Sequence, residues 1–123
     1  MAKRFLMKTD VADVVVELND SRTADSVYLA LPFENYVNVW GEEIYFEIPV
    51  EMGLENGRKV MEVGEVAYWP QGKALCFFFG PTPVSTGPEP VAITPVTPIG
   101  RVVENLEGLT AIGDRMKASL DRV

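Results

Sequence analysis

Residues 74–79 read ALCFFF, an apolar run of strand length that lies between Lys73 and Gly80. Successive side chains of a strand point to opposite faces, so a run that is apolar at every position is buried on both faces. Such a strand belongs in the middle of a sheet or of a barrel wall. The run therefore predicts a β-rich domain in which Cys76 is inert packing, because apolar burial raises the pKa of a thiol.

Several other short runs of β-branched and aromatic residues predict further strands. In residues 11–18, Val14, Val16 and Leu18 share one face of a strand. Residues 37–48 are interrupted at Gly41-Glu42 and predict two strands or one bulged strand. The remaining predicted strands lie at residues 4–8, 60–63, 65–69, 74–79 and 99–104.

Two stretches have the spacing of helices. Residues 24–31 place apolar side chains at i, i+3, i+4 and i+7, after a cap supplied by Asn19-Asp20-Ser21. Pro32 ends this helix because the residue before a proline is pushed out of the α region. A second stripe predicts a C-terminal amphipathic helix: Leu109, Ile112, Met116 and Leu120.

Residues 80–98 contain six of the nine prolines. Proline cannot donate to a central ladder, so this stretch predicts an extended or looped connection, with room for a short edge strand at Val91 and Ile93. No repeat or linker divides residues 1–123, which fit one domain. Many short strands and only two helices favour a mainly β fold, a closed barrel or a sandwich.

Composition excludes several function classes. The chain has no histidine and one cysteine, which excludes the usual Ser-His-Asp and Cys-His catalysis and predicts no metal site and no cofactor. The net charge is −7, and seven glutamates lie between residues 42 and 65. Without a cluster of Lys and Arg, binding to nucleic acid or to an anionic membrane is not expected.

The expected compartment is the cytoplasm. A single cysteine cannot form an internal disulfide and is typical of reducing conditions. No stretch approaches the roughly 20 apolar residues that cross a bilayer. The N-terminal MAKRFLMKTD lacks the long apolar run of a signal peptide.

Three collinear segments resemble cyclophilins. They are VVVELNDSRTADSVYLAL (residues 14–31), GEVAYWPQGKALCFFFG (64–80) and IGRVVENLEGLTAIGDRM (99–116). The runs WGEEIYF and AYWPQGKALCFFFGPTP resemble, more closely, a small prokaryotic family of stand-alone cyclophilin-like barrels with no settled activity. This resemblance implies a closed cyclophilin-like β-barrel, with a short helix after the second strand and a C-terminal helix.

The chain departs from cyclophilins in two places. Their Phe-His-Arg-Ile-Ile-Pro run carries the arginine that polarises the prolyl peptide bond, and the matching stretch here is IYFEIP at residues 44–49. Phe46 or Glu47 takes the place of that arginine, and neither offers the cation that a twisted amide requires. The chain is also expected to stop after its C-terminal helix, without the final strand that closes the cyclophilin barrel.

Aromatic residues beside turns predict a binding groove, since Tyr and Trp combine a large area with a polar tip. Core packing is the alternative for each of them, and Tyr68, Trp69 and Gln71 are the ones that we expect to be exposed for recognition. The candidate ligand-binding residues are Trp40, Glu43, Tyr45, Tyr68, Trp69, Gln71, Phe77, Phe79, Thr82 and Arg101.

Two interpretations stay open for each charged candidate. Glu43 lies among aromatic residues and is either half-buried with a raised pKa or a solvated or hydrogen-bonded structural carboxylate. Arg101 is either an inward-facing cation or a paired surface arginine.

The leading functional hypothesis is a barrel without catalytic residues that binds a small molecule or an extended peptide. The enzymatic alternative is a peptidyl-prolyl isomerase that uses a different donor. A structural or oligomer-forming domain is a third hypothesis, and the sequence leaves the oligomeric state open.

Overall fold

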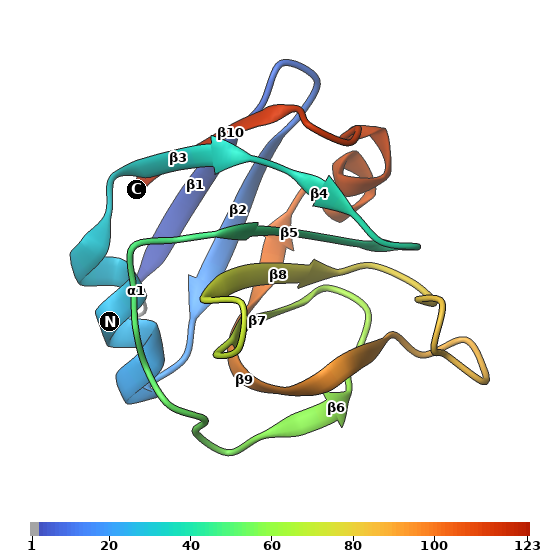
Figure 1. The fold of residues 1–123 in the computed structure, drawn as a ribbon. Helices are drawn as coiled ribbons and strands as arrows, with labels where there is room; N and C mark the ends of the chain where they lie inside the picture. Colours follow the sequence, from blue (N-terminus) through green and yellow to red (C-terminus); the bar gives the residue numbers. More distant parts are fainter. Residues whose placement is uncertain (1–2) are drawn as a thin grey trace.

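A computed structural model describes residues 3–123 of the chain (Figure 1). Its elements in chain order are β1 (Arg4–Lys8), β2 (Asp13–Leu18), α1 (Arg22–Ala30), β3 (Phe33–Tyr36), β4 (Asn38–Val39), β5 (Glu43–Glu47), β6 (Arg58–Val60), β7 (Glu65–Trp69), β8 (Ala74–Phe78), β9 (Val91–Glu104), the 3₁₀ helix η1 (Leu106–Ala111) and β10 (Lys117–Arg122). The fold is therefore mainly β, as the sequence predicted.

The strands form one curled antiparallel sheet in the order β3-β10-β1-β2-β9-β7-β8-β5-β4, and β6 pairs with β9 (Figure 1). Within residues 3–123 the hydrogen-bonded path does not return on itself, so the predicted closure is wrong. Its ends, β3 and β4, are neighbours along the chain on either side of the buried Val37. The Asn35 side-chain amide donates to the carbonyl of Glu47 at 2.8 Å and links β3 to the end of β5.

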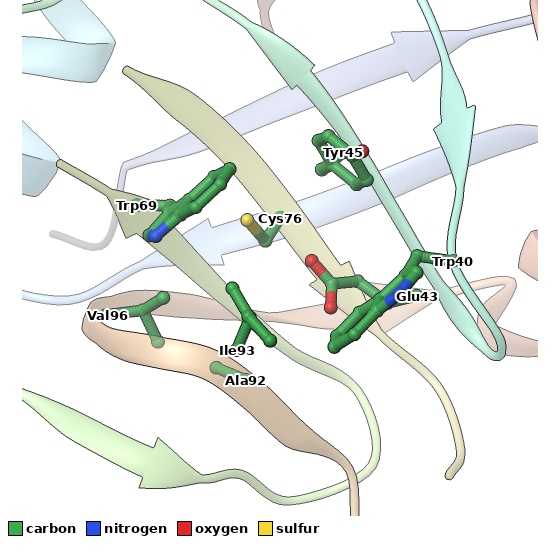
Figure 2. A pocket seen from close by; sticks show the side chains of 8 residues that line it. All are labelled: Trp40, Glu43, Tyr45, Trp69, Cys76, Ala92, Ile93 and Val96. Atoms are coloured by element: carbon green, nitrogen blue, oxygen red, sulfur yellow. The ribbon is translucent and has the colours of Figure 1, made fainter. Parts of the chain in front are cut away.

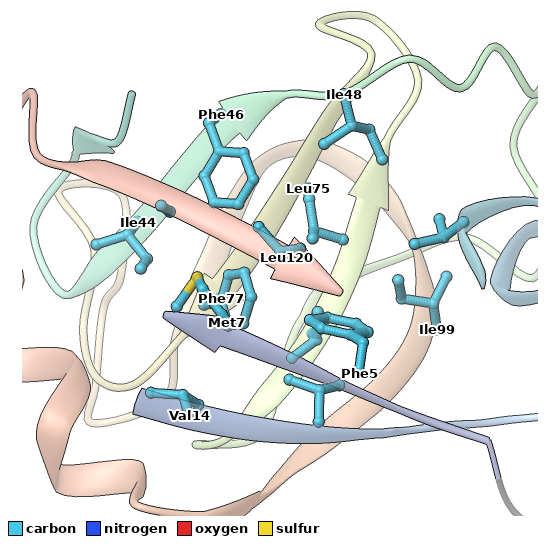
Figure 3. Packing of buried hydrophobic residues seen from close by; sticks show 14 of the residues in the cluster. Phe5, Met7, Val14, Ile44, Phe46, Ile48, Leu75, Phe77, Ile99 and Leu120 are labelled. Atoms are coloured by element: carbon cyan, nitrogen blue, oxygen red, sulfur yellow. The ribbon is translucent and has the colours of Figure 1, made fainter. Parts of the chain in front are cut away.

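The main core fills the inside of the curled sheet. Phe77 of β8 stacks on Phe46 of β5, with ring centroids 6.2 Å apart, and meets the edge of Phe5 (Figure 3). On β2, Val14 and Val16 are fully buried and Leu18 nearly so, which confirms the face predicted from their alternation. Every residue of β8 is buried, as the ALCFFF run predicted, because this strand has packed side chains on both of its faces.

Helix α1 lies where the sequence placed it. The Ser21 hydroxyl accepts from the amide of Ala24 at 3.0 Å and caps the first turn. Leu31, before Pro32, is extended and ends the helix. No helix within residues 3–123 is long and apolar enough to cross a membrane.

The C-terminal segment differs from the prediction. Only η1 is helical, and residues 117–122 form β10, which pairs with β1 on one side and β3 on the other. The predicted C-terminal helix and the missing final strand are both wrong. Buried Ala118 and Leu120 alternate with half-buried Ser119, and this period of two was hidden by residues that also fit a helical stripe.

The proline-rich stretch was predicted correctly only in part: residues 80–90 form no helix or strand, but the strand that follows is long and is not an edge strand. Residues 91–104 form one long strand, whose second half lies between β2 and β7 and whose first half pairs with β6. Its register shifts near Pro98, which pairs with Ala67. A bulge leaves a residue outside the regular ladder, so a proline without an N–H is accepted there. Strand β6, at residues 58–60, lies earlier than the predicted strand at residues 60–63.

The register of β10 predicts which of two neighbouring substitutions destabilises the protein more, and a C-terminal helix would give the opposite order. Ala118→Asp puts a carboxyl into the core and should lower the free energy of unfolding by at least about 2 kcal/mol in urea titrations. Ser119→Asp should change it by less than about 1 kcal/mol. A helical stripe through Met116 would contain position 119 and exclude 118, so a larger loss in Ser119→Asp would contradict the strand.

Candidate functional site

A second apolar cluster covers the outer face of the sheet. Cys76 and Phe78 of β8 point away from the main core and pack with Ala67 of β7. The first half of β9 lies over these residues and adds Ala92 and Val96, and Met61 completes the cluster. We call these six residues the outer cluster; Tyr45 and Trp69 pack against it.

A pocket of about 210 Å³ opens between the outer face of the sheet and β9 (Figure 2). Three aromatic side chains and a carboxylate contribute most of its functional groups, and aliphatic side chains of β9 complete the wall. The lining residues are Trp40, Glu43, Tyr45, Trp69, Cys76, Ala92, Ile93 and Val96.

A tight hairpin turn places Trp40 beside Glu43. The two residues exchange backbone hydrogen bonds, N–H to O, of 2.9 and 3.2 Å. Directly opposite residues of an antiparallel pair point to the same face, so both side chains reach the pocket. Gly41, with φ +61°, occupies the first position of the turn, where an L side chain would be strained and its Cβ would lie 2.8 Å from Pro83 Cδ.

Register places the next aromatic residues. Tyr45 is opposite Cys76, which is opposite Ala67, and Trp69 lies two residues further along β7 on the same face. The rings of Tyr45 and Trp69 meet edge to face, with centroids 6.2 Å apart and planes at 87°. The Trp69 indole N–H donates to Thr94 Oγ1 at 2.7 Å, which holds the ring against β9.

Glu43 is the charged group of the pocket, and only 5% of its surface is exposed. Its Oε1 atom is buried and has no hydrogen-bond partner within residues 3–123. Burial raises the pKa of this carboxyl from 4.5 to about 7, and a hydrogen bond from the Cys76 thiol opposes the rise. Burial and the nearby carboxylate together raise the pKa of Cys76 well above its usual value, so the thiol is not a nucleophile at neutral pH.

The structure brings four of the ten predicted site residues into this pocket and leaves six outside it. Four of the six are structural: Phe77 lies in the main core, Phe79 packs against it, Thr82 donates to the Val91 carbonyl, and the Tyr68 hydroxyl donates to the Val50 carbonyl at 2.6 Å. The expectation that Tyr68 is exposed is therefore wrong, because its position on β7 points inward.

The other two residues lie on the surface. Gln71 is exposed and accepts from the Thr94 hydroxyl at 3.3 Å. The Arg101 side chain is 57% exposed and forms an ion pair with Glu62 at 2.9 Å, so it is the paired surface arginine and not the inward-facing cation.

Sequence reasoning missed the wall that β9 supplies and the place of Cys76 in the lining. The prolines predicted a loop at residues 80–98, which concealed the alternation of buried Ala92, exposed Ile93 and buried Val96. The sequence itself has no period of two there, because Val91, Ala92 and Ile93 are all apolar, so pairing with β6 and β7 decided the position of this wall.

The stretch IYFEIP, at residues 44–49, which matches the arginine-bearing run of cyclophilins in sequence, contains no Lys or Arg. Phe46 is fully buried in the main core, and Glu47 is exposed at the end of β5. The lining of the pocket contains neither Lys nor Arg. Within residues 3–123 no three His, Cys, Asp or Glu side chains come together in a way that could hold a metal ion.

The raised pKa of Glu43 predicts a specific pH dependence of stability. The native state binds its proton more tightly than the unfolded state, so between about pH 4.5 and 7 the free energy of unfolding falls as pH rises. The penalty, about 3 kcal/mol, is complete above pH 7 and absent below pH 4.5. In urea titrations Glu43→Gln should therefore gain stability relative to the wild type as pH increases from 4.5 to 8.

A variant without a titratable change provides the control. Leu29→Ala removes an exposed side chain of α1, and its difference from the wild type should stay constant over the same pH range. A constant difference for Glu43→Gln as well would mean that the carboxyl is not desolvated.

Two comparisons with known proteins bear on identity. Residues 3–121 match the model of a family described as Cyclophilin-like. The solved structures include the hypothetical protein AF2241 from Archaeoglobus fulgidus, which is 37% identical, with a TM-score of 0.85, over 99% of this chain and 95% of that one. A search of curated proteins finds no match. The chain belongs to the Cyclophilin-like family.

Proposed function

We propose that this protein binds a small molecule in the pocket between the outer sheet face and β9. The observation that carries the proposal is the combination of three aromatic side chains with the buried carboxyl group of Glu43, whose Oε1 atom has no hydrogen-bond partner within residues 3–123. Binding sites are commonly apolar cavities with a few placed polar groups. An orphaned buried oxygen is destabilising unless a ligand or a function compensates for it.

The size of the pocket favours a small molecule over an extended peptide. Its volume of about 210 Å³ equals roughly seven water molecules of liquid, at about 30 Å³ each. Drug-sized ligands occupy about 300–1,000 Å³. An extended peptide would require a longer groove, so the peptide hypothesis is the weaker one.

Isomerase activity is the competing hypothesis, and the chemistry of the lining argues against it. A prolyl isomerase needs a fixed cation or donor near the twisted amide. The Trp69 N–H is already bonded to Thr94, the other donors of the lining, on Trp40 and Tyr45, are uncharged, and the charged group is a carboxylate. A binding protein without catalysis fits these groups better.

The binding proposal predicts that a compact apolar probe enters the pocket. In titrations of ¹⁵N-labelled protein, 3,3-dimethyl-1-butanol should shift the indole signals of Trp40 and Trp69, with a Kd of order 10 mM. Trp69→Ala and Tyr45→Ala should each weaken binding at least fivefold, since each removes a wall. Tyr36→Ala, which removes an exposed aromatic ring outside the pocket, should leave the affinity unchanged.

Chemical-shift changes spread over the whole surface, or equal affinity in all three variants, would contradict the proposal that the probe binds in this pocket. A solution mass above that of the monomer, together with no binding of any probe, would favour the structural hypothesis instead.

The binding proposal also predicts the outcome of an activity assay. In a coupled proline-isomerisation assay with a short peptide substrate, the protein should leave the rate at background. A rate above background that is lost in Trp69→Ala and kept in Tyr36→Ala would place catalysis in the pocket and overturn the binding-only proposal.

A further inference from the structure

The groups that line the pocket point to the charge of its occupant. Resting on the proposed function, we propose that the pocket takes a small organic cation, an ammonium group with apolar substituents, with Glu43 as its counter-ion. The supporting side chains come from β5, β7 and β9 and from the turn between β4 and β5, so several parts of the sheet build the site together.

The carboxylate lacks a partner of opposite charge. Glu43 Oε1 is buried without a hydrogen bond within residues 3–123, and no Lys or Arg lines the pocket. A buried charge is normally paired or neutralised, because leaving it alone in an apolar setting is strongly unfavourable. A cation is the ligand class that would satisfy Glu43 in its ionised form.

The aromatic rings suit a cation with apolar substituents. Tyr45 and Trp69 stand at 87° to each other and form two walls, and in Figure 2 the Glu43 carboxylate lies between the indoles of Trp40 and Trp69. Faces of Trp and Tyr attract ammonium groups, by about 0.5–1 kcal/mol when exposed and about 2 when desolvated. Methyl or methylene groups on the nitrogen would contact Ala92 and Ile93 as well.

Proton linkage follows from this arrangement. The titratable groups that face Glu43 are Cys76 on β8 and Tyr45 on β5, and β7 and β9 contribute only Trp69 and aliphatic side chains. Near neutral pH the carboxyl is partly protonated because burial raises its pKa to about 7. A cation favours the ionised form, so binding should release a proton and strengthen as pH rises from 6 to 8.

A matched pair of probes tests the charge. Choline and 3,3-dimethyl-1-butanol have the same shape, and only choline carries a fixed positive charge. At pH 8 and 150 mM NaCl, choline should bind at least tenfold more tightly, with both affinities measured by chemical-shift titration. Its affinity should rise between pH 6 and 8, whereas that of the neutral alcohol should stay constant.

Two variants that each remove one negative charge distinguish a specific contact with Glu43 from attraction of the cation to the net negative charge of the protein. Glu43→Gln should reduce the preference for choline to threefold or less, while Glu42→Gln, an exposed neighbour in the same turn, should keep it. Equal loss in both variants would assign the preference to the net charge of −7 and overturn the inference.

The failures of the two proposals differ. If the alcohol binds as tightly as choline, the pocket is a binding site and the inference of a cation is wrong. If binding of the alcohol strengthens as pH falls, protonated Glu43 is a hydrogen-bond donor to neutral ligands, which also overturns it. If neither probe shifts the pocket signals, both proposals fail.

A trimethylammonium group like that of choline occurs both in free small molecules and on methylated lysine side chains of proteins. A tripeptide that contains trimethyllysine, titrated beside choline, tells these sources apart. Similar affinities would support a free small molecule, and a tenfold tighter peptide would assign the cation to a modified lysine side chain.

Discussion

Strand β9 has two roles, and the pocket depends on both. Its second half pairs with β2 and β7 and completes the curled sheet, whereas its first half pairs with β6 and lies over the outer face. Ala92 and Val96 thereby bury Cys76 and Phe78, which would otherwise face solvent. Without this covering strand, the outer face would carry exposed aromatic residues and Glu43 would be an ordinary surface carboxylate.

The buried environment of Glu43 lowers the stability of the protein at and above neutral pH. Burial without a cationic partner is unfavourable by about 3 kcal/mol above neutral pH. Proteins commonly hold such strained groups where function requires them, and the surrounding structure fixes the side chain in place. Here the hairpin turn at Gly41 and the contact of Pro83 with that turn hold Trp40 and Glu43 side by side.

Membership of the Cyclophilin-like family defines the fold but leaves the activity open. The residue that matches the cyclophilin arginine most directly, Phe46, packs in the main core, and the outward neighbours on β5 are Tyr45 and Glu47. The outer face of this strand carries an aromatic ring and carboxylates and no positive charge.

Local sequence patterns were enough to predict the mainly β class, the buried strand β8, the face of β2 and the cap of α1, because each depends on alternation or on a neighbouring residue. The same patterns brought Trp40, Glu43, Tyr45 and Trp69 into the candidate set. They could not predict β10, whose residues also fit a helix, or the path of β9 through its prolines. Pairing with distant strands decided both, and the same pairing decided that Tyr68 points inward and Trp69 outward. The sequence by itself determined which side chains were available, and only the tertiary structure determined which of them share a pocket, since register across strands is set by contacts between residues far apart in the chain.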